Sequence, residues 1–166
     1  MAAVLVSLGL AAVVGAVVYF RTHVTSEEMS AASAARELET ARARYAGERP
    51  LIEFLGTGAI VHRDPSAPAR PLKSLHVLVY DPREEELTRG DFPASAVRIA
   101  SMSGRIKLMG LGFIGTGSDN LTFEDLERHG PGLILDSSGG EMGTLVFSDA
   151  MIGTATGGVR MLIWTE

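Results

Sequence analysis

The pattern of apolar and polar positions divides the chain into three parts. Residues 1–20 carry no charged side chain, and Arg21 follows them directly. Residues 22–49 are rich in Ala, Glu and Arg, whereas from Pro50 onward short apolar runs alternate with turn-forming residues. The pattern predicts an anchor over residues 1–21, a connecting segment over 22–49 and a folded domain over 50–166.

The first apolar stretch, MAAVLVSLGLAAVVGAVVYF, has the length of a transmembrane helix. Twenty helical residues rise about 30 Å, which matches the hydrocarbon core of a bilayer. A cleaved signal peptide would need a basic start and a small-residue cleavage site, but no Lys or Arg precedes this run and it ends in Tyr19-Phe20-Arg21. A buried core helix is usually shorter and carries a polar face. We therefore predict a single transmembrane helix.

Flanking charge predicts the orientation of this helix. Lys and Arg stay preferentially on the cytoplasmic side of a membrane. Here they follow the apolar run: Arg21, Arg36, Arg42, Arg44 and Arg49. We expect a single-pass protein of the inner membrane, with the N-terminus outside and the C-terminal domain in the cytoplasm.

Small residues recur every four positions along the predicted anchor, at Ser7, Ala11 and Gly15. Small side chains let transmembrane helices approach closely. The spacing makes these three residues interface candidates, although Ala and Gly are also common in any transmembrane segment.

The segment after the anchor reads as a polar helix. Thr25 and Glu28 have the spacing of a capping box, and Gly47 with Pro50 would end the helix. Its apolar face is thin, consisting of Met29, Ala32, Leu38, Ala41 and Tyr45. We expect this helix to be a solvated stalk or to lie against a partner, rather than to bury itself in a core.

Beyond Pro50 the apolar pattern predicts short strands separated by turns. Two short helices interrupt them, over residues 93–100 and 122–129, the second ended by Gly130-Pro131-Gly132. The expected strands are 51–55, 59–62, 75–80, 87–92, 105–109, 133–135 and 159–164. The fold class is therefore α+β: a transmembrane helix, a polar connecting helix and a small, mostly antiparallel β domain with short helices.

Composition narrows the chemistry. The net charge is −5, so no basic surface argues for nucleic acid. The chain has no cysteine, which excludes disulfides, thiolate metal sites and a cysteine nucleophile.

The sequence motifs do not indicate a catalysed reaction. Residues 110–115 match GxGxxG, but a nucleotide site also needs a helix that opens at those glycines, and Thr116–Asn120 cannot begin a long one. The histidines lack metal-ligand spacing, and His76 is expected at the surface or at an edge. We predict no catalytic residue, no cofactor, no metal ion and no small-molecule substrate, and hence no enzyme.

Two glycine-rich segments, Gly104–Leu121 and Ser137–Gly158, hold apolar side chains without a regular pattern. Phe113 and Ile114 are the most prominent of these. They belong either to the core or to a contact with another chain, and they complete the set of interface candidates.

Four stretches resemble one group of proteins: ARARYAGERPLIEF, LKSLHVLVYDPREEELTRGDFPASAVRIA, LTFEDLERHGPGLILD and the closing VRMLIWTE. They are similar to small uncharacterised bacterial single-pass membrane-anchored proteins. The resemblance covers most of the chain apart from the two glycine-rich segments. It implies a fold rather than an activity, and it carries over no catalytic residue.

These features predict a non-catalytic accessory subunit of a larger integral-membrane complex, such as a photosynthetic reaction centre–light-harvesting or respiratory complex. Its partners would be other membrane-protein subunits and the lipid bilayer. The alternative is a free membrane-tethered binding or regulatory module that captures a soluble protein on a sheet edge.

Overall fold

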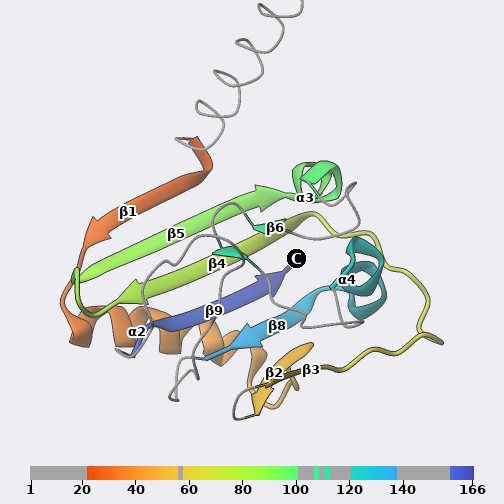
Figure 1. The fold of residues 1–166 in the computed structure, drawn as a ribbon, viewed down its shortest axis with the longest axis horizontal. Helices are drawn as coiled ribbons and strands as arrows, with labels where there is room; N and C mark the ends of the chain where they lie inside the picture. The colour runs from red at the N-terminus through yellow and green to blue at the C-terminus, as the bar shows by residue number, and fades with distance from the viewer. Residues whose placement is uncertain (1–21, 56–57, 101–106, 109–110, 113–120, 138–157) are drawn as a thin grey trace, which may run out of the picture.

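The computed structural model describes residues 22–55, 58–100, 107–108, 111–112, 121–137 and 158–166, and its centre is one seven-stranded sheet (Figure 1). The strand order is β1-β5-β4-β9-β8-β2-β3, and every neighbouring pair is antiparallel except β2 and β8. The strands are β1 (Val24–Glu28), β2 (Ile52–Leu55), β3 (Gly58–Val61), β4 (Ser74–Asp81), β5 (Glu86–Pro93), β8 (Gly132–Asp136) and β9 (Arg160–Thr165). The α+β class and the mostly antiparallel sheet are confirmed.

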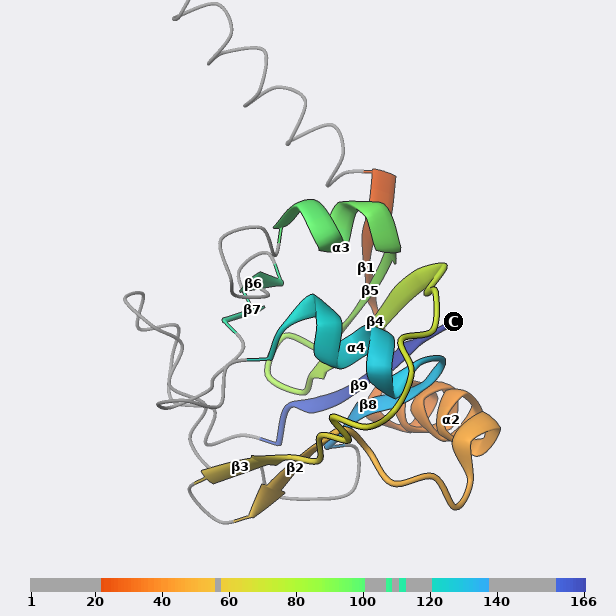
Figure 2. The same cartoon turned by 90° about the vertical axis from the view of Figure 1, so that its right-hand side faces the viewer.

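Both faces of the sheet are buried, because helices cover each side (Figure 2). Successive side chains of a strand point to opposite faces. Along β4, Leu75 and Val77 accordingly pack against α3 (Ala94–Ala100) and α4 (Phe123–His129), whereas Leu78 and Tyr80 pack toward α2 (Ala31–Arg42). The domain therefore has two apolar clusters, one on each side of the sheet.

The prediction for the segment after the anchor was wrong in two respects. Residues Val24–Glu28 form strand β1, which pairs with β5, and the helix begins only at Ala31 with Ser30 as its N-cap. The helix also buries Ala34, Leu38 and Ala41 against the sheet. These three small or aliphatic residues are enough to pack the helix onto the sheet, because the facing strands supply large side chains, among them Tyr80 and Trp164.

The predicted hairpin and the short helices are confirmed. Strands β4 and β5 pair over their whole length across a turn at Pro82–Glu85, and α3 follows directly. Helix α4 begins at a capping box in which Thr122 and Asp125 bond to each other's backbone N–H, and Gly130 ends it. Lys107–Leu108 (β6) and Leu111–Gly112 (β7) pair as a separate two-stranded ladder.

Several predictions lie outside the described residues. These are the anchor over 1–21 with Ser7, Ala11 and Gly15, the contacts of Phe113 and Ile114, and most of the two glycine-rich segments. Among the helices that the structure does describe, none is both long and apolar enough to cross a membrane.

Candidate binding site

A charged pocket of about 700 Å³ lies where strand β3 ends. Its walls come from the residues before β2, the connection that follows β3, helix α4 and the turn after α4. Four arginines, four carboxylates and two histidines line it, together with the apolar residues Leu51, Pro65, Ala67 and Pro131. The pocket therefore offers charges of both signs rather than one.

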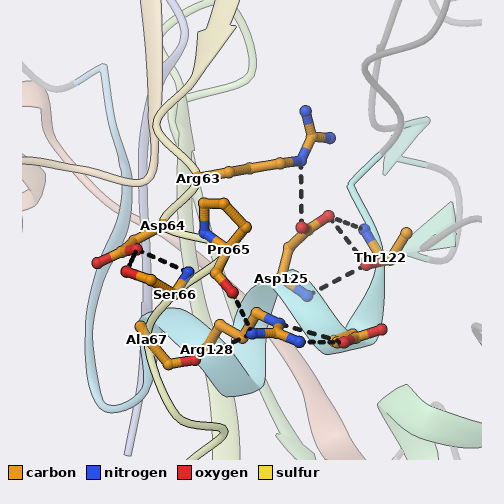
Figure 3. Close-up of polar contacts among 9 residues, drawn as sticks. Arg63, Asp64, Pro65, Ser66, Ala67, Thr122, Asp125 and Arg128 are labelled. Carbon is orange, nitrogen blue, oxygen red and sulfur yellow. Dashed lines mark hydrogen bonds and ion pairs between the residues drawn. The ribbon is translucent and has the colours of Figure 1, made fainter.

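Arg128 of helix α4 fastens the connection after β3 to the wall of the pocket (Figure 3). Its Nη1 donates to the backbone carbonyls of Pro65 (2.6 Å) and Ala67 (3.0 Å), while its Nη2 donates to Glu124 at 2.7 Å. Since a guanidinium presents its donors in a rigid plane, it holds two carbonyls and a carboxylate at once. A connection without secondary structure of its own is thereby fixed in place.

A second contact joins the same two segments. Arg63 donates from Nε to Asp125 at 3.1 Å, and Asp125 also accepts from the backbone N–H of Thr122 (Figure 3). Within the connection, Asp64 accepts from the backbone and the hydroxyl of Ser66, and these bonds lower the pKa of Asp64 below its usual value. The rim of the pocket is thus a network of partnered charges.

His129 and Glu48 both line the pocket and both lie next to Gly132. Both His129 Nε2 and Glu48 Oε2 lie within 3.2 Å of the position that a Cβ on Gly132 would occupy. The missing side chain of Gly132 is what leaves room for the two polar groups. Nε2 is buried without a hydrogen-bond partner in the structure, and burial lowers the pKa of His129.

Arg70 closes the other side of the His129 turn. Its guanidinium donates to the His129 carbonyl and lies against Gly130, where a Cβ would come within 2.4 Å of Nε. Gly130 also has φ +77°, a conformation that glycine adopts at little cost. The Gly-Pro-Gly sequence that predicted the end of the helix therefore also makes space for an arginine.

Two further residues of the pocket lining, His62 and Arg49, share one partner: His62 bonds to Glu53 (2.9 Å), which also accepts from Arg49 at 3.0 Å. The hydrogen bond from His62, followed by that from Arg49, lowers the pKa of Glu53. Because His62 comes directly after β3, this group connects the pocket with the edge of the sheet.

A separate polar cluster lies across the middle of the sheet. His76 bonds to Ser74 Oγ through Nε2 (2.8 Å) and to Asp91 Oδ1 through Nδ1 (2.5 Å), and its ring stacks on Trp164. His76 does not lie at an edge of the sheet: it belongs to the inner strand β4, and its side chain is partly buried, with 18% exposed.

Serine, histidine and aspartate in this order also form the catalytic unit of serine hydrolases. Such an enzyme needs backbone N–H groups free to stabilise an oxyanion. Here the N–H groups of Lys73 and Ser74 both donate to the Glu166 carbonyl, at 2.5 and 3.2 Å. We interpret the cluster as cross-strand packing, since Asp91 and Trp164 are the register partners of His76 on β5 and β9.

The two edges of the sheet differ in character. Edge strand β1 carries Glu27 and Glu28, and Glu27 accepts from Arg89 at 3.0 Å. Edge strand β3 reads GAIV, without a charge, and Ile60 is 44% exposed. Charged residues protect a strand edge against pairing with another chain, and only β1 has them.

The sequence missed the pocket because its parts are distant along the chain. The Gly-Pro-Gly turn was predictable from the sequence. Its closeness to Glu48, Arg70 and Arg128 was not, because it depends on the tertiary fold. Within the described ranges, no group of three or more His, Asp or Glu could hold a metal ion. No protein-family model, no curated protein and no solved structure matches the chain.

Proposed function

We propose that the protein is a membrane-tethered, non-catalytic module that captures an extended segment of a partner protein at strand β3. The observation that carries this proposal is the contrast between the two sheet edges. A strand edge presents unpaired N–H and C=O groups that a further strand can bond. β1 carries glutamates, which disfavour pairing with another strand, whereas β3 is uncharged and exposes Ile60.

The hydrogen bonds of the hairpin indicate which groups of β3 are available. His62 N–H donates inward to Leu51 O at 2.8 Å. N–H groups alternate in direction along a strand, so that of Ile60 also points toward β2, whereas those of Ala59 and Val61 point outward. These two outward donors are the ones that an added strand would use.

The pocket extends the same surface. A partner strand running parallel to β3 would lead toward His62 and Arg63, which line the pocket. Because both signs of charge line the pocket, a segment with acidic and basic side chains beyond its apolar strand would fit it best. This lining suits a protein segment of mixed charge better than a small molecule of one charge.

The position of helix α2 favours the tethered module over an accessory subunit. The accessory role was inferred partly from a polar helix whose apolar face could bind another subunit. In the structure, the apolar face of α2 packs against the sheet of its own domain. If the captured segment belongs to a membrane protein, strand β3 would bind a subunit of a larger membrane complex. Identifying the partner therefore distinguishes a tethered module from an accessory subunit.

A photo-crosslinking residue at position 60, in the full chain in membranes of the native host, tests the proposal. We expect a discrete crosslinked partner. Ala59→Pro should abolish the crosslink because it removes an outward N–H, while proline is tolerated where a strand's N–H faces solvent. Ala59→Val is the matched control, since it keeps the N–H and should keep the crosslink.

Equal crosslinking in the Ala59→Pro and Ala59→Val proteins would contradict capture by strand addition. A thermal unfolding transition measured for both variants shows that the domain remains folded. The same crosslinking residue at Ser26, on the guarded edge β1, should yield no discrete partner.

A further inference from the structure

Two large apolar side chains are strongly exposed within the described part of the chain, and they lie far apart in the sheet topology. Ile60 belongs to edge strand β3. Ile99 is 69% exposed and belongs to α3, which follows strand β5 beside the opposite edge. The edge proposed for partner capture accounts for Ile60 and leaves Ile99 without a role.

Contacts on both sides hold α3 in one orientation. Val97 is buried in the core, and Arg98 pairs with Glu127 and lies over the ring of Phe123 at 4.7 Å. At the start of the helix, Ala94 N–H donates to the Lys73 carbonyl at 2.9 Å. These contacts fix the orientation of the helix, and Ile99 lies on the part of its surface that stays exposed.

Helix α3 lies at the end of the sheet where the chain enters it. Val24 of β1 is the register partner of Gly90 on β5, and α3 begins four residues after Gly90. Figures 1 and 2 both draw α3 at the end where β1 begins. The apolar stretch of residues 1–20 ends four residues before Val24 in the sequence, so a bilayer that held this stretch would have to lie near the start of β1.

We propose that α3 rests on the lipid surface and inserts Ile99 into the interfacial region, as a second contact beside the anchor. One apolar side chain binds a membrane weakly by itself. Here the anchor makes the contact intramolecular, and the high effective concentration lets a weak contact persist. This contact would orient the domain so that β3 faces away from the membrane. The inference takes the predicted anchor as its premise.

The absence of cysteine from the chain allows a single label at each position. The full-length Ile99→Cys and Ile60→Cys proteins are labelled with an environment-sensitive nitrobenzoxadiazole dye and reconstituted into phosphatidylcholine vesicles, at about one protein per vesicle. We expect the label at position 99 to emit at shorter wavelength and to lose intensity with nitroxide-bearing lipid. The label at position 60 should show neither effect.

Each other outcome overturns the proposal in a distinct way. If the protein does not float with the vesicles, the anchor fails, and with it both the lipid contact and the tether of the proposed function. If it floats but the two labels behave alike, only the lipid contact of α3 fails. A blue shift that appears only at high protein-to-lipid ratio would mean that Ile99 contacts a second copy of the chain instead.

Discussion

At the scale of residues, His129 shows how burial and backbone shape together set the state of one side chain. The ring is hydrogen-bonded to the backbone of Leu133, lies near Glu48 and Arg70, and keeps Nε2 out of solvent. Burial is the largest influence and lowers its pKa below the ordinary value of 6.5, with a further contribution from Arg70. The folded protein therefore favours the neutral imidazole.

This preference predicts a pH dependence of stability. Well above pH 6.5 the ring is neutral in both the folded and the unfolded chain, so it adds no slope. Below 6.5 the unfolded chain takes up the proton first, and the free energy of unfolding falls until the pH reaches the lowered pKa. His129→Gln should remove this part of the slope in urea unfolding measured from pH 7.5 downward.

The control comes from the more acidic part of the same plot of unfolding free energy against pH. Glu53 has a lowered pKa, so its contribution to stability is present above its ordinary value of 4.5 and is lost as the pH falls below it. That loss should remain in the His129→Gln protein. An unchanged slope just below pH 6.5 in the variant would show that the His129 ring is not the group responsible.

Residue patterns predicted the end of helix α4, because the termination of a helix by glycine is local. Gly130 ends α4, as the sequence indicated, and Thr122 caps it. The contact of Arg70 with Gly130 was not predictable, since the two residues are brought together by the fold and no spacing in the sequence marks the pair.

At the scale of elements, the segment after the predicted anchor shows where local preference fails. Thr25 and Glu28 have the spacing of a capping box, yet residues 24–28 form a strand because β5 offers a complete antiparallel partner. The helix begins at Ala31 instead, after the N-cap Ser30, whose side chain accepts from Ser33 N–H. Pairing with a distant strand decided the outcome, and a single sequence does not display it.

Helix α2 should accordingly contribute to the stability of the whole domain. Leu38 is 1% exposed between the helix and the sheet. Leu38→Ala leaves a cavity there and should lower the free energy of unfolding by about 2–5 kcal/mol. The exposed neighbour Glu39 is the matched control, and Glu39→Ala should change stability by less than about 0.5 kcal/mol. Similar small effects for both variants in chemical denaturation would mean that the helix is a stalk after all.

At the scale of the whole molecule, the two proposed contacts belong to opposite ends of the strand order. Strand β1 is the first strand after the apolar stretch of the sequence, and β3 is the opposite edge of seven strands, roughly 30 Å away at the usual strand spacing. The hairpin β4–β5 and the bounds of β2, β3, β8 and β9, to within about one residue, followed from alternation and turns, whereas β1 was expected to be helical. The strand order, including the parallel pair β2 and β8, did not, because contacts between distant segments leave no periodic signal.

Amide hydrogen exchange at Ala59 and Val61 tests the capture of a partner strand most directly. The protein is compared in two states: gently solubilised with its partner from native membranes, and alone in phosphatidylcholine vesicles. We expect these two outward amides to exchange markedly more slowly with the partner, because the added strand bonds them, while the amides of β1 exchange equally in both states. Equal exchange at Ala59 and Val61 in the two states would contradict strand addition at β3.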